Sequence, residues 1–143
     1  MREIKFRVWD KQKKRWIENT GNPYVFPFNG KVAMTCWGSK TGYISDTDYS
    51  EYYELSQYTG LKDKNEKEIY EGDIISVVDI GTNPSENSRH QIVYCGEDDY
   101  PAFDLKPHLD CDSNGLSYLK AGGDEEMIVI GNVYENPELL KEK

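Results

Sequence analysis

The residues of this chain with the greatest potential for chemistry lie between positions 57 and 75, in the stretch QYTGLKDKNEKEIYEGDII, where acidic, basic and aromatic side chains alternate around glycines. The run Asp63-x-Asn65-x-Lys67 begins like a calcium-binding loop, which places oxygen ligands at alternate positions. However, Lys67 occupies a ligand position, Glu68 replaces the required glycine, and Ile74 stands where the bidentate glutamate should be. The stretch therefore indicates a charged hairpin turn, and we expect no metal ligand in it.

The dipeptide Gly72-Asp73 immediately precedes the apolar pair Ile74-Ile75. Glycine tolerates the backbone conformation of a tight bend, and an aspartate just before a strand commonly accepts backbone N–H bonds. A catalytic Asp73 would need a histidine or a second carboxylate nearby, and within this stretch only Glu68 and Glu71 could serve. We therefore expect a structural role for Gly72 and Asp73, and we assign no catalytic residue.

A zinc site could in principle be formed by Cys95, His108 and Cys111 together with His90. Their spacing is irregular and contains no close pair of ligands, unlike the usual zinc-binding motifs. The sequence also lacks a G-x-S-x-G motif and a recognised cysteine-nucleophile context. We expect ordinary thiols and histidines, no cofactor and no enzymatic activity. The less favoured alternative, a metal-dependent enzyme, would need scattered carboxylates to converge with His90 or His108.

Acidic side chains cluster in three runs, which are Glu97-Asp98-Asp99, Asp110-x-Asp112 and Asp124-Glu125-Glu126. Such runs could bind a divalent cation or imitate the phosphates of a nucleic acid. More often they are loops whose charges face water, and we adopt that interpretation. Gly122-Gly123 does not indicate a phosphate-binding loop, because the three acids that follow would repel phosphate.

Basic residues gather near the start of the chain, around the aromatic side chains of Phe6, Trp9 and Trp16. They are Lys5, Arg7, Lys11, Lys13, Lys14 and Arg15. Positive charge interleaved with aromatic rings can bind single-stranded nucleic acid, although a solvated hairpin face beside a core is the more frequent explanation. The possible interaction face comprises Lys5, Arg7, Trp9 and Trp16.

Composition limits the classes of protein to consider. The chain has 143 residues, which is near the usual size of one domain, and we expect a single domain over residues 1–143. Only 37% of the residues are hydrophobic but 13% are aromatic, so large rings supply much of the apolar surface. The formal net charge of -9 disfavours a generic binder of duplex nucleic acid, whose affinity depends on neutralising phosphates.

Cysteine usage and hydropathy indicate a compartment. The 3 cysteines include no CxxC pair, which favours a reducing environment over a disulfide framework. We find no signal-peptide pattern near the start and no run of about 18 apolar residues that could cross a membrane. We therefore expect a protein of the cytoplasm that does not bind a membrane.

Short apolar runs separated by turn residues predict a chain built mainly of strands. In the first run, alternation places Ile4, Phe6 and Val8 on one face. The other predicted strands fall at residues 15–17, 24–28, 32–37, 52 onward, 74–78, 90–95 and 127–133, and residues 97–123 should carry short strands and long connections. Asn136-Pro137 begins a short C-terminal helix, with Asn as its cap. The predicted fold class is all-β or β-dominated, with a small barrel-like core of short antiparallel strands, long loops and that helix.

One short pattern occurs twice. Residues 10–17, DKQKKRWI, match residues 63–70, DKNEKEIY, as D-K-[QN]-x-K-x followed by two apolar or aromatic residues. The match is too short for a domain repeat, so we interpret it as two hairpin turns built with the same chemistry.

Three blocks of the sequence, in this order, resemble the YopX family of phage and prophage proteins. They are IKFRVWD at residues 4–10, QYTGLKDKN followed by EIYEGDII within residues 57–75, and IGNVYENPELL at residues 130–140. The family-motif residues, for which we expect structural roles, are Tyr58, Gly60, Asp63, Asn65, Tyr70, Glu71, Gly72 and Asp73. The resemblance implies a mostly β, oligomeric protein encoded by temperate phages of Gram-positive bacteria. It supplies no catalytic residues and no molecular role.

Glu66 departs from the family pattern, which commonly has Gly after the position of Asn65. The departure weakens the expectation of a tight turn with two left-handed residues. Since Asn65 can still adopt a left-handed conformation, we predict a longer or differently typed turn.

Together these features predict a non-enzymatic, oligomeric protein of phage or prophage origin that binds another macromolecule in the cytoplasm of its bacterial host. Its partners would be further copies of itself and a host or phage protein. The alternative from another class is a nucleic-acid binder that uses the basic and aromatic hairpin near the N-terminus.

Overall fold

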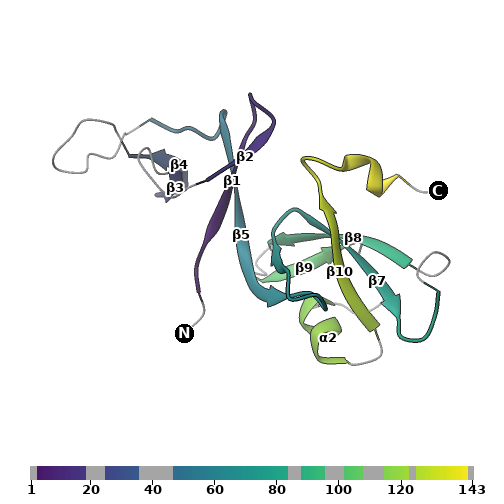
Figure 1. Ribbon diagram of the computed structural model, residues 1–143. Coiled ribbons are helices and arrows are strands. Elements are labelled where there is room, and N and C mark those ends of the chain that lie inside the picture. Colours follow the sequence, from purple (N-terminus) through teal and green to yellow (C-terminus); the bar gives the residue numbers. More distant parts are fainter. Residues whose placement is uncertain are drawn as a thin grey trace. The chain divides into compact units, whose positions relative to one another are not determined.

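The computed structural model describes residues 3–18, 25–35, 47–83, 88–95, 102–107, 115–122 and 125–141. Within these residues the fold is β-dominated, with ten antiparallel strands that include a half-barrel sheet and one short α-helix towards the C-terminus (Figure 1). The predicted fold class is therefore confirmed.

The chain divides into two compact units, Glu3–Gln57 and Tyr58–Lys143, which we call the N-terminal and C-terminal units. The division falls inside the longest strand, β5 (Tyr53–Lys62), so each unit receives part of that strand. A single domain over the whole chain stays a prediction.

The N-terminal unit is built on antiparallel pairing around β1 (Phe6–Asp10). On one side β1 pairs with β2 (Arg15–Ile17), and on the other it pairs with the first half of β5, from Phe6 opposite Gln57 to Asp10 opposite Tyr53. A separate two-stranded sheet is formed by β3 (Val25–Phe28) and β4 (Lys31–Met34). The predicted strand 32–37 is described only as far as residue 35.

The predicted first strand was placed two residues too early. Ile4 precedes β1 and is 72% exposed, whereas Val8, Trp9 and Asp10 are all buried. Ile4 therefore does not share the buried face that alternation assigned to it. The reason is tertiary, because the pairing with β5 sets where β1 begins and both faces at its end are covered.

The C-terminal unit contains the main sheet, in the order β10-β7-β8-β9. Its strands are β7 (Asp73–Asp79), β8 (Ser88–Cys95), β9 (Phe103–Lys106) and β10 (Glu125–Asn132), and the short β6 (Glu68–Tyr70) pairs with the end of β5. β7 is central and is buried on both faces over its first six residues, as its β-branched run Ile-Ile-Ser-Val-Val allows.

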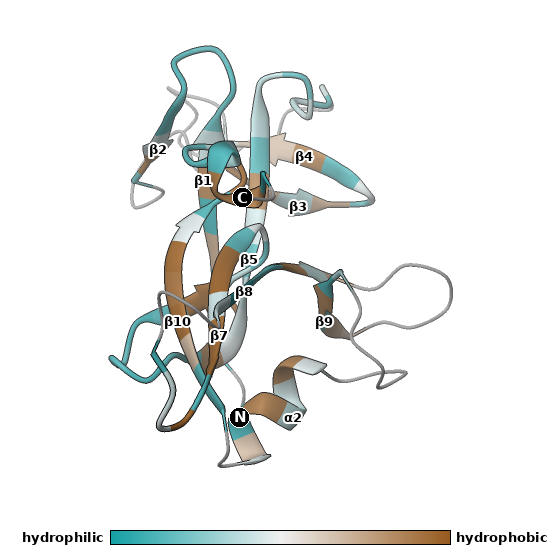
Figure 2. Ribbon diagram, turned by 90° about the vertical axis from the view of Figure 1, so that its right-hand side faces the viewer, coloured by the Kyte–Doolittle hydropathy of each residue, from teal (hydrophilic) through white to brown (hydrophobic). Residues whose placement is uncertain are grey.

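One face of this sheet packs against the helix α2 (Gly115–Gly122) to form the core, and Figure 2 shows hydrophobic residues along β7, β10 and α2. The core comprises Ile69, Ile75, Val77, Val93, Leu105, Leu116, Leu119, Met127 and Val129, with Leu61 and Phe103 packed against it. Burying each Leu or Ile side chain stabilises the fold by about 1.5 to 3 kcal/mol.

Helix α2 was not predicted, since residues 97–123 were expected to carry short strands and long connections. The helix is only eight residues long and begins and ends with glycine, so its intrinsic propensity is low. It is stabilised instead by contacts with distant residues. Leu116 and Leu119 are buried in the core, and the carboxylate of Asp104 accepts a 2.9 Å hydrogen bond from the N–H of Gly115.

The predicted C-terminal helix is present as the 3₁₀-helix η1 (Pro137–Leu140), with proline in its first turn. The capping role assigned to Asn136 was wrong, because its side chain makes no cap hydrogen bond. Its Oδ1 atom instead accepts a long, 3.4 Å bond from the N–H of Asn132, at the end of β10. The amide therefore joins the segment back to the strand that precedes it.

Candidate functional site

The family motif forms a hairpin turn between β5 and β6, organised by the buried carboxylate of Asp63. Its Oδ1 atom accepts bonds from the N–H groups of Asn65 at 2.8 Å and Lys67 at 3.0 Å. Its Oδ2 atom accepts a bond from the N–H of Val129, in β10, at 3.0 Å. Asp63 is 1% exposed, so its charge is balanced by three backbone donors. The predicted hairpin turn is confirmed.

The same turn covers the outer edge of β10. The N–H of Lys64 donates to the carbonyl of Met127 at 3.1 Å, and the Lys64 ammonium pairs with Glu126. From α2, Lys120 Nζ donates to the carbonyl of Lys62 at 2.8 Å. An unpaired strand edge invites association with other chains. The motif therefore closes the side of β10 that does not face β7.

The left-handed residue of this turn is Glu66, with φ of 63°, and Asn65 is not left-handed. The N–H of Glu66 donates to the carbonyl of Asp63 at 3.2 Å, so the turn spans residues 63–66 and the left-handed Glu66 is its last residue. The prediction of a different turn type is confirmed, but the residue to which it assigned the left-handed conformation is wrong. A glycine at this position would adopt the conformation without the steric cost that Glu66 bears.

The turn between β1 and β2 uses related chemistry, as the repeated sequence pattern predicted. Asp10 Oδ1 accepts bonds from the N–H groups of Gln12 at 3.0 Å and Lys13 at 2.9 Å, and Lys14 is left-handed with φ of 52°. In both turns an aspartate accepts two backbone bonds and a left-handed residue follows it. The left-handed residue comes four positions after Asp10 but three positions after Asp63.

Gly72 and Asp73 shape the entry into β7. Gly72 has φ of 80°, and its N–H and carbonyl bond to Val93 at 2.7 Å and Val133 at 2.9 Å. Asp73 is buried, and its Oδ2 atom accepts a 2.8 Å bond from the N–H of Tyr70. The glycine bend and the backbone-binding aspartate are the arrangement that the sequence predicted.

The remaining motif residues differ in exposure. Tyr58 is buried and its ring lies 5.3 Å from that of Tyr70, which is half-buried and donates from its hydroxyl to Glu68 at 2.9 Å. Gly60 is exposed and left-handed, and Glu71 is half-buried. The motif's two tyrosines thus contribute more to packing than to an open surface.

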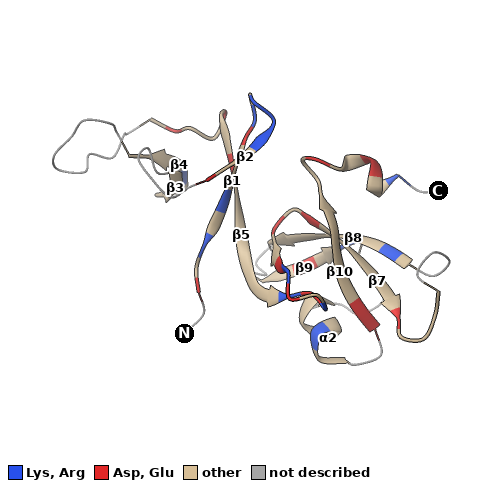
Figure 3. Cartoon of the chain, viewed as in Figure 1, with Lys and Arg blue, Asp and Glu red and all other residues tan. Residues whose placement is uncertain are grey.

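The structure brings together three of the four residues of the predicted interaction face in the N-terminal unit. The Arg7 guanidinium lies 4.2 Å from the centre of the Trp16 ring, and the rings of Trp9 and Trp16 meet edge to face at 5.1 Å. Arg7 Nε also donates to Ser56 at 3.1 Å. Lys5, the fourth residue of the face, pairs with Glu3 at 3.6 Å. Figure 3 shows that Lys and Arg occur on β1, on β2 and in the loop between them.

Trp9 is only 4% exposed, so the open part of this face consists of Lys5, Arg7 and Trp16, which are all half-buried. The face is therefore narrower than its sequence suggested. It retains one cation stacked on one aromatic ring, which is a geometry that can also receive a nucleobase.

The residues considered as metal ligands are only partly described. His90 Nδ1 lies 2.9 Å from the carbonyl oxygen of Leu139, and Cys95 is exposed. His108, Cys111 and the acidic runs at 97–99 and 110–112 lie outside the described residues. In the part of the chain that is described, no three His, Cys, Asp or Glu side chains are grouped so that they could hold a metal ion.

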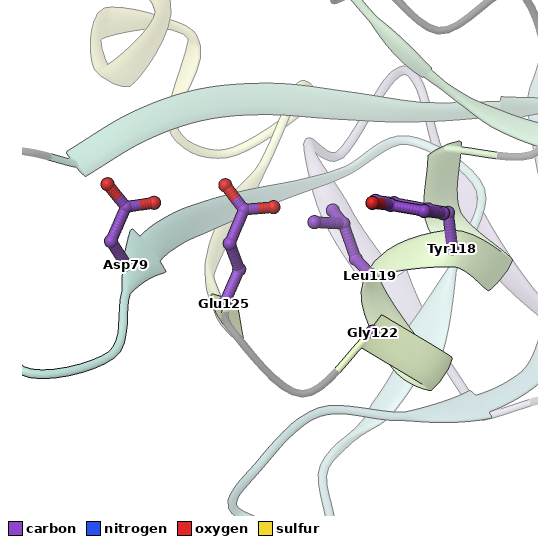
Figure 4. A pocket seen from close by; sticks show the side chains of 5 residues that line it. All are labelled: Asp79, Tyr118, Leu119, Gly122 and Glu125. Atoms are coloured by element: carbon purple, nitrogen blue, oxygen red, sulfur yellow. The ribbon is translucent and has the colours of Figure 1, made fainter.

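The structure also contains a hollow that the sequence did not predict. It has a volume of about 410 Å³ and is lined by Asp79, Tyr118, Leu119, Gly122 and Glu125, all in the C-terminal unit. Figure 4 shows the carboxyl groups of Asp79 and Glu125 extending in the same direction from the ends of β7 and β10, with Leu119 and Tyr118 projecting from α2.

The two carboxylates of the hollow are neighbours because Asp79 and Glu125 are directly opposite in the antiparallel pairing of β7 and β10. Arg89, on β8, lies between them. Its Nη2 atom bonds to Glu125, and its Nη1 atom lies 3.8 Å from Asp79. Its Nε atom is buried and has no hydrogen-bond partner among the described residues. The guanidinium thus pairs closely with Glu125 and only loosely with Asp79.

The interpretation of residues 124–126 as a solvated loop was wrong for the two residues that are described. Glu125 and Glu126 begin β10, and they pair with Arg89 and Lys64 respectively. Charge at the start of a strand resembles loop charge in a sequence, and the two cations that bind these acids are 36 and 62 positions away. No local signal could have identified them.

Over the described residues, the fold defines a class of protein, which is β-dominated with a half-barrel sheet and one short α-helix packed on strands. The chain belongs to the YopX family, because the family's sequence model, described as YopX protein, matches residues 5–141. The suspected membership is confirmed.

A similar solved structure is titled "Crystal structure of protein EF1440 from Enterococcus faecalis". Its TM-score to this structure is 0.62 at 29% sequence identity, and the alignment covers 97% of this chain and 99% of that one. The search among curated proteins finds no match. Across the residues that the structure describes, no helix has the length and apolar character needed to cross a membrane.

Proposed function

We propose that this YopX family protein is a non-enzymatic module that binds another macromolecule, in the cytoplasm of a bacterium that carries the phage or prophage encoding it. The observation that carries the proposal is the exposure of large apolar side chains beside the hollow. Tyr118, in its lining, is 65% exposed, and Ile80, which follows Asp79 in the chain, is 57% exposed. Exposed apolar groups next to a hollow are typical of protein contact sites.

The hydrogen bonding of the motif supports a binding role over a chemical one. The carboxylates of Asp63 and Asp73 accept backbone bonds and are buried, so they organise the chain. Function then depends on the surface that this scaffold presents.

Capture of partners tests the proposal. The tagged full chain is used to isolate host and phage proteins from an induced lysate, and each candidate is then purified and mixed with the chain to measure a stoichiometric complex. We expect a discrete complex that is weakened when Ile80 is changed to Ser and Tyr118 to Ala. The matched control is Phe28→Ser, an exposed apolar residue of the N-terminal unit. The proposal would be contradicted by a partner that binds the Ile80 and Tyr118 variant as well as it binds the Phe28→Ser control. It would also be contradicted if no partner is captured.

We also propose that the protein is oligomeric. The N-terminal unit exposes Ile4 and Tyr52, which adds apolar surface to that of the C-terminal unit. Light scattering of the purified chain at high micromolar concentration should give a mass above that of the 16.5 kDa protomer. A clean monomer at that concentration would remove this part of the proposal.

The second candidate function is binding of single-stranded nucleic acid by the Arg7–Trp16 stack. The stacked cation and ring favour it, while the net charge of -9 and the burial of Trp9 oppose it. Labelled single- and double-stranded DNA and RNA are titrated at two salt concentrations. We expect no salt-sensitive binding at micromolar protein. Binding that weakens with salt and is lost in Arg7→Gln would favour this candidate instead.

A further inference from the structure

The hollow at the ends of β7 and β10 carries an excess of negative charge. Like charges directly opposite on neighbouring strands repel each other, and Asp79 and Glu125 are such a pair. Arg89 is a single cation shared between two carboxylates, and it bonds closely only to Glu125. The Asp79 side chain is 54% exposed, so it remains accessible to a second cation.

The wall opposite the carboxylates is apolar and aromatic. Leu119 supplies an aliphatic surface that is continuous with the core, and Tyr118 supplies an exposed ring (Figure 4). A lysine or arginine side chain matches such a site, because its methylene stem packs on apolar surface while its charged end meets a carboxylate or a ring face. Arg7 over Trp16 at 4.2 Å and Lys106 over Tyr94 at 4.3 Å show that this chain already uses cation–ring contacts.

We propose that the hollow receives an arginine or lysine side chain from a partner protein, with Asp79 as the counter-ion of its charged end and Leu119 and Tyr118 against its stem. The inference rests on the proposed function and names the chemistry of its partner. Charge complementarity supports it beyond the hollow, since a chain of net charge -9 attracts and orients a basic surface. Arginine suits the site better than lysine, because its planar guanidinium presents a rigid fork of donors that can pair with a carboxylate through two parallel bonds.

The test uses the full chain, labelled with ¹⁵N, and two blocked peptides that differ only in charge. The first is Ac-Gly-Arg-Gly-amide, and the second replaces arginine with citrulline, its uncharged analogue. We expect the arginine peptide to shift the amide resonances of Asp79, Tyr118, Leu119 and Gly122, and the citrulline peptide to leave them in place.

Two variants locate the binding site. Asp79→Asn should lower the affinity for the arginine peptide by about two- to five-fold, as expected for an exposed ion pair. Tyr118→Ala should lower it by a similar factor because the ring is lost. The control is Glu138→Gln, which removes one negative charge from an exposed position on η1. It should leave the affinity unchanged. Both test residues are largely exposed, so the variants should fold, which unchanged resonances elsewhere would verify.

Three results would overturn the inference. They are equal shifts with both peptides, shifts spread over other acidic surfaces, and equal losses in Asp79→Asn and Glu138→Gln. The proposed function fails separately. If a purified partner requires Ile80 and Tyr118 but binds Asp79→Asn as well as the natural chain, the binding role stands and the cationic recognition is refuted.

Discussion

Removal of the Asp63 carboxylate should destabilise the C-terminal unit more than any other single change in the family motif. In Asp63→Ala, the N–H of Val129 loses its acceptor inside the sheet, which costs about 2 kcal/mol for a buried, charge-assisted bond. The N–H groups of Asn65 and Lys67 also lose their acceptor, but both residues are exposed and water can replace it, so each costs about 0.5 to 1 kcal/mol. We expect a total loss of about 3 to 4 kcal/mol, which is a large part of the 5 to 15 kcal/mol typical of a domain.

The matched control is Asp10→Ala, because Asp10 accepts two similar turn bonds, and among the described residues its carboxylate accepts no bond from a neighbouring strand. All three tryptophans, at positions 9, 16 and 37, precede residue 58, so their fluorescence reports on the N-terminal unit. Hydrogen exchange of the Val129 amide reports on the C-terminal unit. In Asp63→Ala this exchange should accelerate by about 30-fold, which corresponds to the 2 kcal/mol above. It should not change in Asp10→Ala.

Asp63 does not have this stabilising role if Asp63→Ala lowers the free energy of unfolding by less than about 1 kcal/mol and leaves the exchange of Val129 unchanged. That result would mean that the turn is attached to β10 by its other contacts, which are the backbone bond from Lys64 to Met127 and the ion pair of Lys64 with Glu126. Far-UV circular dichroism in urea, compared between the two variants, provides the free energies.

Three further changes test other parts of the structure. Glu66→Gly should raise the free energy of unfolding, measured in urea titrations, by about 1 kcal/mol. It relieves the left-handed strain and loses only an exposed ion pair. No change would mean that the turn is unstrained. Gly72→Ala should lower the free energy of unfolding by about 2 kcal/mol, since φ is positive and a Cβ would lie 3.0 Å from the Tyr134 ring. A thermal midpoint equal to that of the natural chain would contradict this prediction. The bond from the Ser50 N–H holds the pKa of Asp48 below its ordinary value of 3.8, so the stability it contributes is present above that value and is lost as the pH falls through the lower, folded pKa. Tryptophan fluorescence in urea should therefore show a smaller loss between about pH 5 and pH 2 in Asp48→Asn than in the natural chain, and identical losses would refute the assignment.

Alternation and turn chemistry identified most of the strands in advance. β7 and β10 coincide with short continuous runs of apolar residues, and the hairpin turns at Asp10 and Asp63 follow from the residues that turns prefer. The glycine bend at Gly72 is equally local. These features depend on interactions among residues close in the chain, so the sequence displays them directly.

Helix α2 could not be predicted in the same way. Its own residues favour a helix weakly, and it exists because Leu116 and Leu119 bury against strands while Asp104 binds its first N–H. The left-handed residue of the turn is Glu66 and not the predicted Asn65 for a similar reason. The register of the turn against β10 determines which residue occupies the strained position, whatever that residue's preference.

The sequence by itself therefore determined the β-dominated class, the turns and the family. Only the tertiary structure decided what the charged residues do. Asp63 meets Val129 across 66 positions, and Arg89 meets Glu125 across 36. Asp79 and Glu125 become neighbours only through the pairing of β7 with β10. The physical reason is that packing over the whole sheet sets the partner and the register of each strand. The residue types within a strand do not determine which distant strand pairs with that strand.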